Sequence, residues 1–281
     1  MLKNYQLLLF IGLQLLIVGT GHSLTCKSVF HSFDSETQTV LTYLDQPISK
    51  YKQSLLKKTW NSIDTKINKN KSILSKKNMM ALLKLRTSSS HTLKGFDGER
   101  NQQIALKNFS TASKFILKSL DSTDVTIDFI KTVNSIHRTG KESPADFRSA
   151  DATLGTQSLY KVISPKDIEA SMEQLITWYQ TNDGKMHPIE LAARFYQKLI
   201  SIHPFEDANG RTTRDIMDFI LMKHGYPPAV FDGRTVFASA VVFGLINPPK
   251  GYPQSQTPVT PVEALTEAIK NSIELLIENN S

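Results

Sequence analysis

HPFEDANGRTTR, from His203 to Arg214, is the stretch of this 281-residue chain that decides its fold and indicates its chemistry. It places a histidine, two carboxylates, an asparagine, a glycine and two arginines almost side by side. A segment buried only for packing would not tolerate so many ionisable groups, because unpaired charges are costly to bury. The stretch is therefore a candidate functional site.

The stretch lies between two helical patterns, one ending near His203 and the next beginning near Asn209. Unsatisfied N–H groups and the helix dipole favour an anion at the start of the second helix. Ala208 and Gly210 carry little side chain, so a phosphate can approach the backbone closely. The sequence predicts a phosphate site at this helix start.

Charged side chains around the helix start extend this prediction. Arg211 and Arg214 are three residues apart, which suits contacts with successive phosphates. Phosphates usually arrive with magnesium, for which Asp207 supplies a carboxylate oxygen. His203 is the group able to accept a proton near neutral pH. Each residue alone is a weak signal, but their conjunction indicates group transfer from a nucleotide to a hydroxyl.

Most of the remaining chain has helical spacing and almost no convincing strands, so the fold class is mainly α. The expected helices lie at residues 50–86, 102–120, 125–137, 166–180, 188–203, 209–224 and 261–278. A loop rich in small and polar residues, from 138 to 165, is expected to hold a short hairpin. The last helix is expected to bury one side, formed by Val262, Leu265, Ile269, Ile273 and Leu276.

The net charge of +7 is concentrated in one segment. Residues 50–86 hold eleven Lys and Arg against one acid, Asp64, which leaves 22 basic and 25 acidic residues elsewhere. Such a block can bind nucleic acid or anionic lipid. Apolar residues interrupt it at helical spacing, namely Tyr51, Leu55, Trp60, Ile63 and Ile67. We interpret it as a solvated helix face and expect no nucleic-acid partner.

The first 25 residues have the pattern of an export signal. Lys3 precedes an apolar run at residues 7–18, which is short for a membrane span and has the length of a secretory signal. An uncleaved signal anchor at residues 5–21 is the alternative. The lone Cys26 excludes an intramolecular disulfide and a multi-cysteine zinc site.

The chain resembles Fic-domain proteins of the Fido superfamily over about residues 125–231. The family signature is H-x-F-x-D/E-G-N-G-R-x-x-R, matched by His203, Phe205, Asp207, Asn209, Gly210, Arg211 and Arg214. The flanking stretches HPIELAARFYQKLISIHPF and RDIMDFILMKHGYPP are similar to the helices on either side of that signature, and ADFRSADATLG resembles the family's flap. We therefore divide the chain into residues 1–25, a Lys-rich helical region at 26–120, a Fic domain at 121–246, and a Pro-rich linker with a helix at 247–281.

The resemblance implies a helical core with a β-hairpin flap, and AMP transfer from ATP to a Ser, Thr or Tyr hydroxyl of a target protein. His203 is then the base, Asp207 holds magnesium, and Arg214 binds the terminal phosphate. The residues expected around the nucleotide are Asp207, Ala208, Asn209, Gly210, Arg211, Thr212, Thr213 and Arg214. The flap residues expected to pair with the target backbone are Thr153, Leu154 and Gly155.

One departure from the family pattern is Ala208, which replaces a glycine. We expect it to be tolerated only if its φ is negative and its methyl group leaves the α-phosphate accessible. Alanine is familiar in the Doc branch, whose members resemble kinases, but that branch has lysine where this chain has Gly210. AMP transfer is therefore preferred over two alternatives, a Doc-like kinase and a catalytically silent binding module.

A second departure concerns control. SHTLKG, residues 90–95, resembles the inhibitory motif S/T-x-x-x-E-G/N of many Fic proteins, with Lys94 in place of the glutamate. If Ser90, Lys94 and Gly95 are a degenerate form of this motif, Lys94 would repel Arg214, and the enzyme would lack this inhibition. Accidental similarity in a Ser-rich loop is the alternative.

The export signal favours a secreted effector that acts inside another cell, on a host signalling protein. A lumenal enzyme of a eukaryotic secretory compartment is the alternative. No pocket for the base is visible in the sequence beyond Phe231, so UTP, GTP and CDP-choline remain alternatives to ATP.

Overall fold

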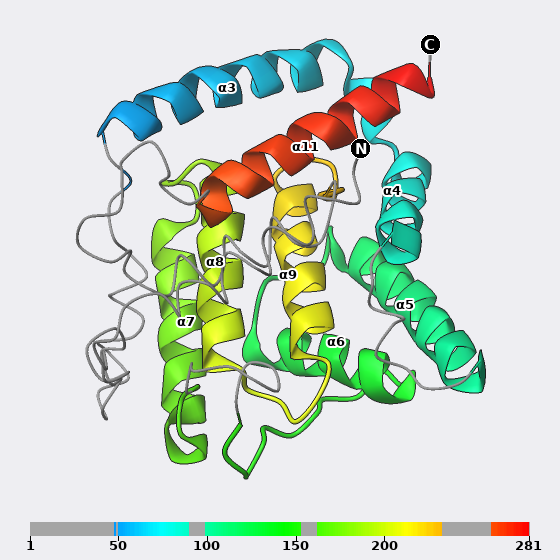
Figure 1. Ribbon diagram of the computed structural model, residues 1–281, viewed down its shortest axis with the longest axis vertical. Helices are drawn as coiled ribbons and strands as arrows, with labels where there is room; N and C mark the ends of the chain where they lie inside the picture. The colour runs from blue at the N-terminus through cyan, green and yellow to red at the C-terminus, as the bar shows by residue number, and fades with distance from the viewer. Residues whose placement is uncertain (1–47, 49, 90–98, 153–161, 232–259, 281) are drawn as a thin grey trace, which may run out of the picture. The chain divides into compact units, whose positions relative to one another are not determined.

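The computed structural model describes residues 48, 50–89, 99–152, 162–231 and 260–280 (Figure 1). All of them belong to one compact unit, Phe33–Ser281. Several predictions lie outside the described residues: the export segment with Cys26, the degenerate motif at residues 90–95, the flap at Thr153, Leu154 and Gly155, and the linker up to residue 259. None of the described helices is long and apolar enough to cross a membrane.

The described residues form eight α-helices and no strand, which confirms the mainly α fold class. The helices are α3 (Lys50–Lys69), α4 (Lys76–Ser89), α5 (Glu99–Ser119), α6 (Ile127–Thr139), α7 (Ile168–Asn182), α8 (Pro188–Ile202), α9 (Asn209–Lys223) and α11 (Pro261–Glu278). Two short 3-10 helices, Lys71–Leu74 and Pro165–Asp167, precede α4 and α7.

Helices α8 and α9 are at the centre of the packing (Figure 1). Helix α8 packs against α7, α9 and α11, while α9 also contacts α5 and α6. Every residue of α8 from Leu191 to Ile202 is buried. A helix that is enclosed on all sides is a rigid support. The connection between α8 and α9 is the HPFEDANGRTTR stretch, so the candidate site is held by the most enclosed helix of the described part.

Helix α3 is amphipathic, but its buried face differs from the predicted one. The buried stripe consists of Leu56, Trp60, Ile63 and Ile67, which faces α11. Tyr51 and Leu55 are 74% and 46% exposed, so their inclusion in the apolar face was wrong. The i, i+4, i+7, i+11 spacing of the buried set selects Leu56 rather than its neighbour Leu55.

Helix α11 agrees with the sequence in its bounds and in its buried side. Its start is a capping box, in which Thr260 Oγ1 accepts from the Glu263 N–H and Glu263 accepts from the Thr260 N–H. All five residues predicted to form the buried side are buried: Val262, Leu265, Ile269, Ile273 and Leu276. They join one apolar cluster that runs from α3 through α8 and α9 to α11.

Candidate active site

The motif loop begins where α8 ends at His203. This residue has φ 51° and ψ 58°, in the left-handed region, while its N–H still donates to the Leu199 carbonyl at 3.1 Å. Left-handed backbone is uncommon in residues other than glycine and turns the chain sharply out of a helix. The two residues that follow, Pro204 and Phe205, are buried, so they hold the loop on the core.

Asn209 closes the motif loop on itself. Its Oδ1 accepts from the Phe205 N–H at 2.9 Å, and its Nδ2 donates to the Phe205 carbonyl at 2.6 Å. Asn134 of α6 ties the same loop from outside, because its Nδ2 donates to the Asp207 carbonyl at 2.9 Å. The Asn209 side chain thus fixes the shape of the loop. Because its side-chain amide is engaged by Phe205, the backbone N–H of Asn209 is the group that can bind a ligand.

Helix α9 starts without a side-chain cap. The first helical bond runs from the Thr212 N–H to the Ala208 carbonyl at 2.9 Å, so the Asn209 and Gly210 N–H groups precede the first intrahelical donor. A Cβ added at Gly210 would lie 3.6 Å from Nη1 of Arg214, which puts that guanidinium beside the helix start. Free amides and an adjacent cation form an anion-binding geometry.

Ala208 itself contradicts the expectation of a negative φ. Its φ is 64° and its ψ is 8°, so the methyl-bearing residue has the left-handed backbone that glycine adopts without strain. Its side chain is buried. The hydrogen bonds of Asn209 and Asn134 fix the loop backbone on both sides of Ala208. The alanine is held in the left-handed conformation by these bonds, although it does not favour that conformation itself.

The two motif arginines have different environments. Arg211 is 8% exposed and donates to Asp207 Oδ2 at 2.9 Å and to the His137 carbonyl at 3.3 Å. Its guanidinium therefore contacts protein oxygens and braces the loop. Arg214 is only partly buried, and it lies at the open helix start beside Gly210. The side chains of Thr212 and Thr213, expected around the nucleotide, are each 1% exposed and face the interior.

The Asp207 carboxylate is a suitable ligand for magnesium. Its side chain is 67% exposed, and only Oδ2 takes part in the ion pair with Arg211. The described ranges contain no cluster of three or more metal-ligating side chains. A single carboxylate beside a phosphate site fits magnesium, which is commonly held by one or two carboxylates together with substrate phosphates.

His203 is electrically neutral at physiological pH. Burial and the nearby Arg148 guanidinium lower the pKa of His203 to about 4, against the opposing effects of the Ile200 carbonyl and Asp207. A neutral imidazole has a lone pair with which to accept a proton. The Asn209 and Gly210 amides of the α9 start are six and seven residues from His203 along one short loop.

Arg148 is a residue of the site that our reading of the sequence missed. It lies in the stretch ADFRSADATLG, is 3% exposed, and donates from Nε to the His203 carbonyl at 2.8 Å. An arginine in a loop rich in small and polar residues gives no sign of burial. The resemblance of that stretch to a flap was the signal that could have indicated Arg148, but the residues predicted from it were Thr153, Leu154 and Gly155.

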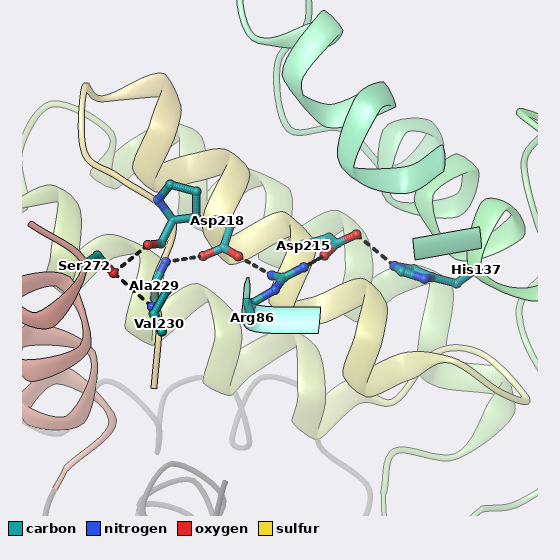
Figure 2. A network of polar contacts seen from close by, with 8 residues as sticks. Arg86, His137, Asp215, Asp218, Ala229, Val230 and Ser272 are labelled. Atoms are coloured by element: carbon teal, nitrogen blue, oxygen red, sulfur yellow. Dashed lines mark hydrogen bonds and ion pairs between the residues drawn. The ribbon is translucent and has the colours of Figure 1, made fainter. Parts of the chain in front are cut away.

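A buried network of charged groups supports α9 at Asp215 and Asp218 (Figure 2). Arg86 of α4 donates to Asp215 and Asp218, and His137 Nε2 lies 2.8 Å from Asp215 Oδ2. Burial alone would raise the pKa of Asp215, but Arg86 and His137 hold it at about 2. The network continues through Asp218 Oδ1, which accepts from the Ala229 N–H at 2.9 Å.

The fold and the site define a class: a helical domain with an anion-binding helix start beside a neutral histidine. Residues 124–221 match the model of the Fic/DOC family. The chain thus carries a Fic domain, which confirms the family resemblance of the sequence.

Two curated relatives and one solved structure show the extent of the likeness. Protein adenylyltransferase Fic of Nematostella vectensis is 35% identical over 137 residues, which cover 47% of this chain and 31% of the relative. Uridine 5'-monophosphate transferase of Xanthomonas campestris is 34% identical over 96 residues, which cover 32% of this chain and 18% of the relative. A Fic family protein from Desulfovibrio desulfuricans has a TM-score of 0.59 at 14% identity, covering 83% of this chain and 76% of that chain. This chain therefore spans a third or less of both curated relatives.

Proposed function

We propose that this protein is a protein adenylyltransferase that transfers AMP from ATP to a Ser, Thr or Tyr hydroxyl of a target protein. The observation that carries the proposal is the neutral histidine at one end of a short loop whose other end is an open helix start flanked by Arg214. Support comes from the relative of Nematostella vectensis, whose name is protein adenylyltransferase.

In the proposed reaction each group has a role. His203 accepts the proton of the target hydroxyl, and the hydroxyl oxygen attacks the α-phosphorus of ATP. The bond from that phosphorus to the bridging oxygen breaks, and pyrophosphate leaves. The amides of the α9 start and the Arg214 guanidinium bind the phosphate oxygens. Magnesium, held by Asp207 and the phosphates, would neutralise the charge on the leaving group.

Labelling with ATP tests the proposal. The full chain is incubated with a cell lysate and ATP labelled at either the α- or the γ-phosphate. Label from the α-phosphate alone supports AMP transfer, label from the γ-phosphate alone indicates a Doc-like kinase, and no label indicates a silent binding module. The His203→Ala variant should lose all transfer. The matched His224→Gln variant, altered at the far end of α9, should keep it.

UMP transfer is the second candidate, because the relative of Xanthomonas campestris is named a uridine monophosphate transferase. A parallel reaction with UTP labelled at the α-phosphate separates the two. Stronger labelling from UTP than from ATP at equal concentration would replace AMP by UMP in the proposal, while leaving the roles of His203 and Arg214 unchanged.

We also propose that the protein is a secreted effector whose target is a signalling protein of another cell, and that it lacks the inhibitory glutamate. The export pattern at residues 1–25 and Lys94 support these two points. A fusion of residues 1–30 to an export reporter tests the first. The Lys94→Glu variant tests whether an inhibitory glutamate has been lost. Lower activity than the parent is expected, and equal activity would contradict the loss of inhibition at this position.

A further inference from the structure

Arg148 connects three separate parts of the backbone through one side chain. Its Nε donates to the carbonyl of His203 at 2.8 Å and its Nη1 to that of Ala150 at 2.7 Å. Its Nη2 donates to the carbonyl of Ile163. The planar guanidinium holds its donors in a fixed fork, so these three carbonyls are set relative to one another.

The backbone of Arg148 reinforces the same connection. Its N–H donates to the Pro204 carbonyl at 2.9 Å, so main chain and side chain both contact the turn that begins at His203. Ala150 and Ile163 lie on either side of residues 153–161 along the chain. Arg148 therefore joins both flanks of that segment to the residue that carries the imidazole.

The charge of Arg148 is unusual for a residue with only a packing role. It is 3% exposed, and the nearby Asp151 carboxylate only partly offsets the lowering of the Arg148 pKa by burial. A buried cation costs several kcal/mol unless its donors are satisfied, and an apolar side chain of similar volume would avoid that cost. Its donors are directed at carbonyl oxygens of three segments, which is an arrangement that fixes backbone positions.

We propose that Arg148 is a positioning residue of the active site. It sets the distance between the base, His203, and the chain flanks at Ala150 and Ile163, between which the target-docking residues are expected. The inference rests on the proposed function, because the reaction needs the target hydroxyl and the imidazole at hydrogen-bond distance. Arg148 does not itself touch the reacting atoms.

Two variants and two measurements test the role. Arg148→Met removes all donors, and Arg148→Lys keeps the charge but lacks the fork. For Arg148→Met we expect the transfer rate to the most strongly labelled protein to fall about 10- to 100-fold. Arg148→Lys should have an intermediate rate. Binding of a non-hydrolysable ATP analogue should change less than about threefold in both, because Arg148 makes no contact with the α9 start.

Hydrogen exchange gives a readout that is independent of activity. In both variants, exchange should rise at residues 149–152 and 162–164 and stay unchanged in α8 and α9. Arg138→Met is the matched control, because Arg138 also contacts the motif loop, through an exposed pair with Glu206 at 3.3 Å. It should leave transfer and exchange as in the parent.

The proposal is overturned if Arg148→Lys transfers at the parental rate, if analogue affinity falls as much as the rate, or if exchange rises throughout α8 and α9. Should Arg148→Met fail to fold, Arg148→Lys decides. A parent protein without any nucleotidyl transfer would defeat the proposed function, and the exchange pattern would then decide separately whether Arg148 fixes the two flanks to His203.

Discussion

Ala208 has a left-handed backbone in the most polar loop of the described chain. In that conformation the Cβ atom lies too close to the neighbouring carbonyl oxygen, which costs about 1 kcal/mol or more relative to glycine. The strain is maintained by the hydrogen bond that Asn134 donates to the Asp207 carbonyl and by the two that join the Asn209 side chain to the Phe205 backbone. Strained backbone that its surroundings enforce is typical of functional loops.

The Ala208→Gly variant should be more stable than the parent by about 1 kcal/mol, because glycine has no Cβ to strain at φ 64°. Its affinity for an ATP analogue should not fall. Urea denaturation and calorimetric titration measure the two effects. Ala193→Gly, at a buried position inside α8, is the control and should lose about 1 kcal/mol. Destabilisation by Ala208→Gly would contradict the strained conformation.

The pKa of His203 makes stability depend on pH. Burial and Arg148 lower it to about 4 in the folded chain, while about 6.5 is expected in the unfolded chain. The unfolded state therefore binds the proton first, so the contribution of His203 is complete above pH 6.5 and is lost as the pH falls towards 4. Between pH 7.5 and 4.5 the parent should lose about 2 kcal/mol more than His203→Gln in urea denaturation. Parallel losses in the two proteins would contradict the lowered pKa.

The candidate site was predictable from the sequence in its order of chemical groups, since a histidine, a carboxylate and an arginine around a helix start have few other uses together. The left-handed Ala208, the engagement of Arg211 by His137 and the role of Arg148 were not predictable. Each depends on contacts between segments far apart in the chain, such as the 55 residues that separate Arg148 from His203.

At the scale of elements, local signals decided which boundaries the sequence predicted correctly. The start of α11 has a complete capping box, and its predicted bounds agree with the structure. Helix α6 begins two residues later than predicted, because the Thr126 side chain caps it by accepting from the Phe129 N–H. It ends at Thr139, two residues later than predicted, and the Gly140 that follows has a left-handed backbone.

Arg86 links helix α4 to α9 through ion pairs with Asp215 and Asp218. The guanidinium is buried between Asp215 and Asp218, so its removal leaves two buried carboxylates without their cation (Figure 2). Arg86→Met should therefore destabilise the protein by about 3–5 kcal/mol in chemical denaturation. Lys76→Met is the control in the same helix. It removes an exposed pair with Asp121 and should cost about 0–1 kcal/mol. Equal effects of the two variants would show that the buried network does not hold α4.

At the scale of the whole molecule, the earliest and latest described helices lie against each other. Trp60 of α3 donates from Nε1 to Thr266 of α11 at 3.0 Å and stacks on His187 with 4.3 Å between ring centroids. Tyr226, which follows α9, donates to Asp64 of α3 at 2.5 Å. The sequence left open whether residues 26–120 pack on the Fic domain, because the α3 partners Thr266 and Tyr226 lie 206 and 162 residues away along the chain.

The continuous core predicts that α3 and the Fic domain unfold together. Trp60→Ala should lower stability by about 3–5 kcal/mol. It leaves Trp178 of α7 as the sole tryptophan, so fluorescence then reports on a helix distant from α3 along the chain. We expect the Trp178 transition and the loss of helical circular dichroism to shift together, in one step. Tyr51→Ala, at a 74% exposed position of the same helix, should leave the midpoint unchanged. A Trp178 transition that stays at the parental midpoint would mean that α3 unfolds as an independent unit.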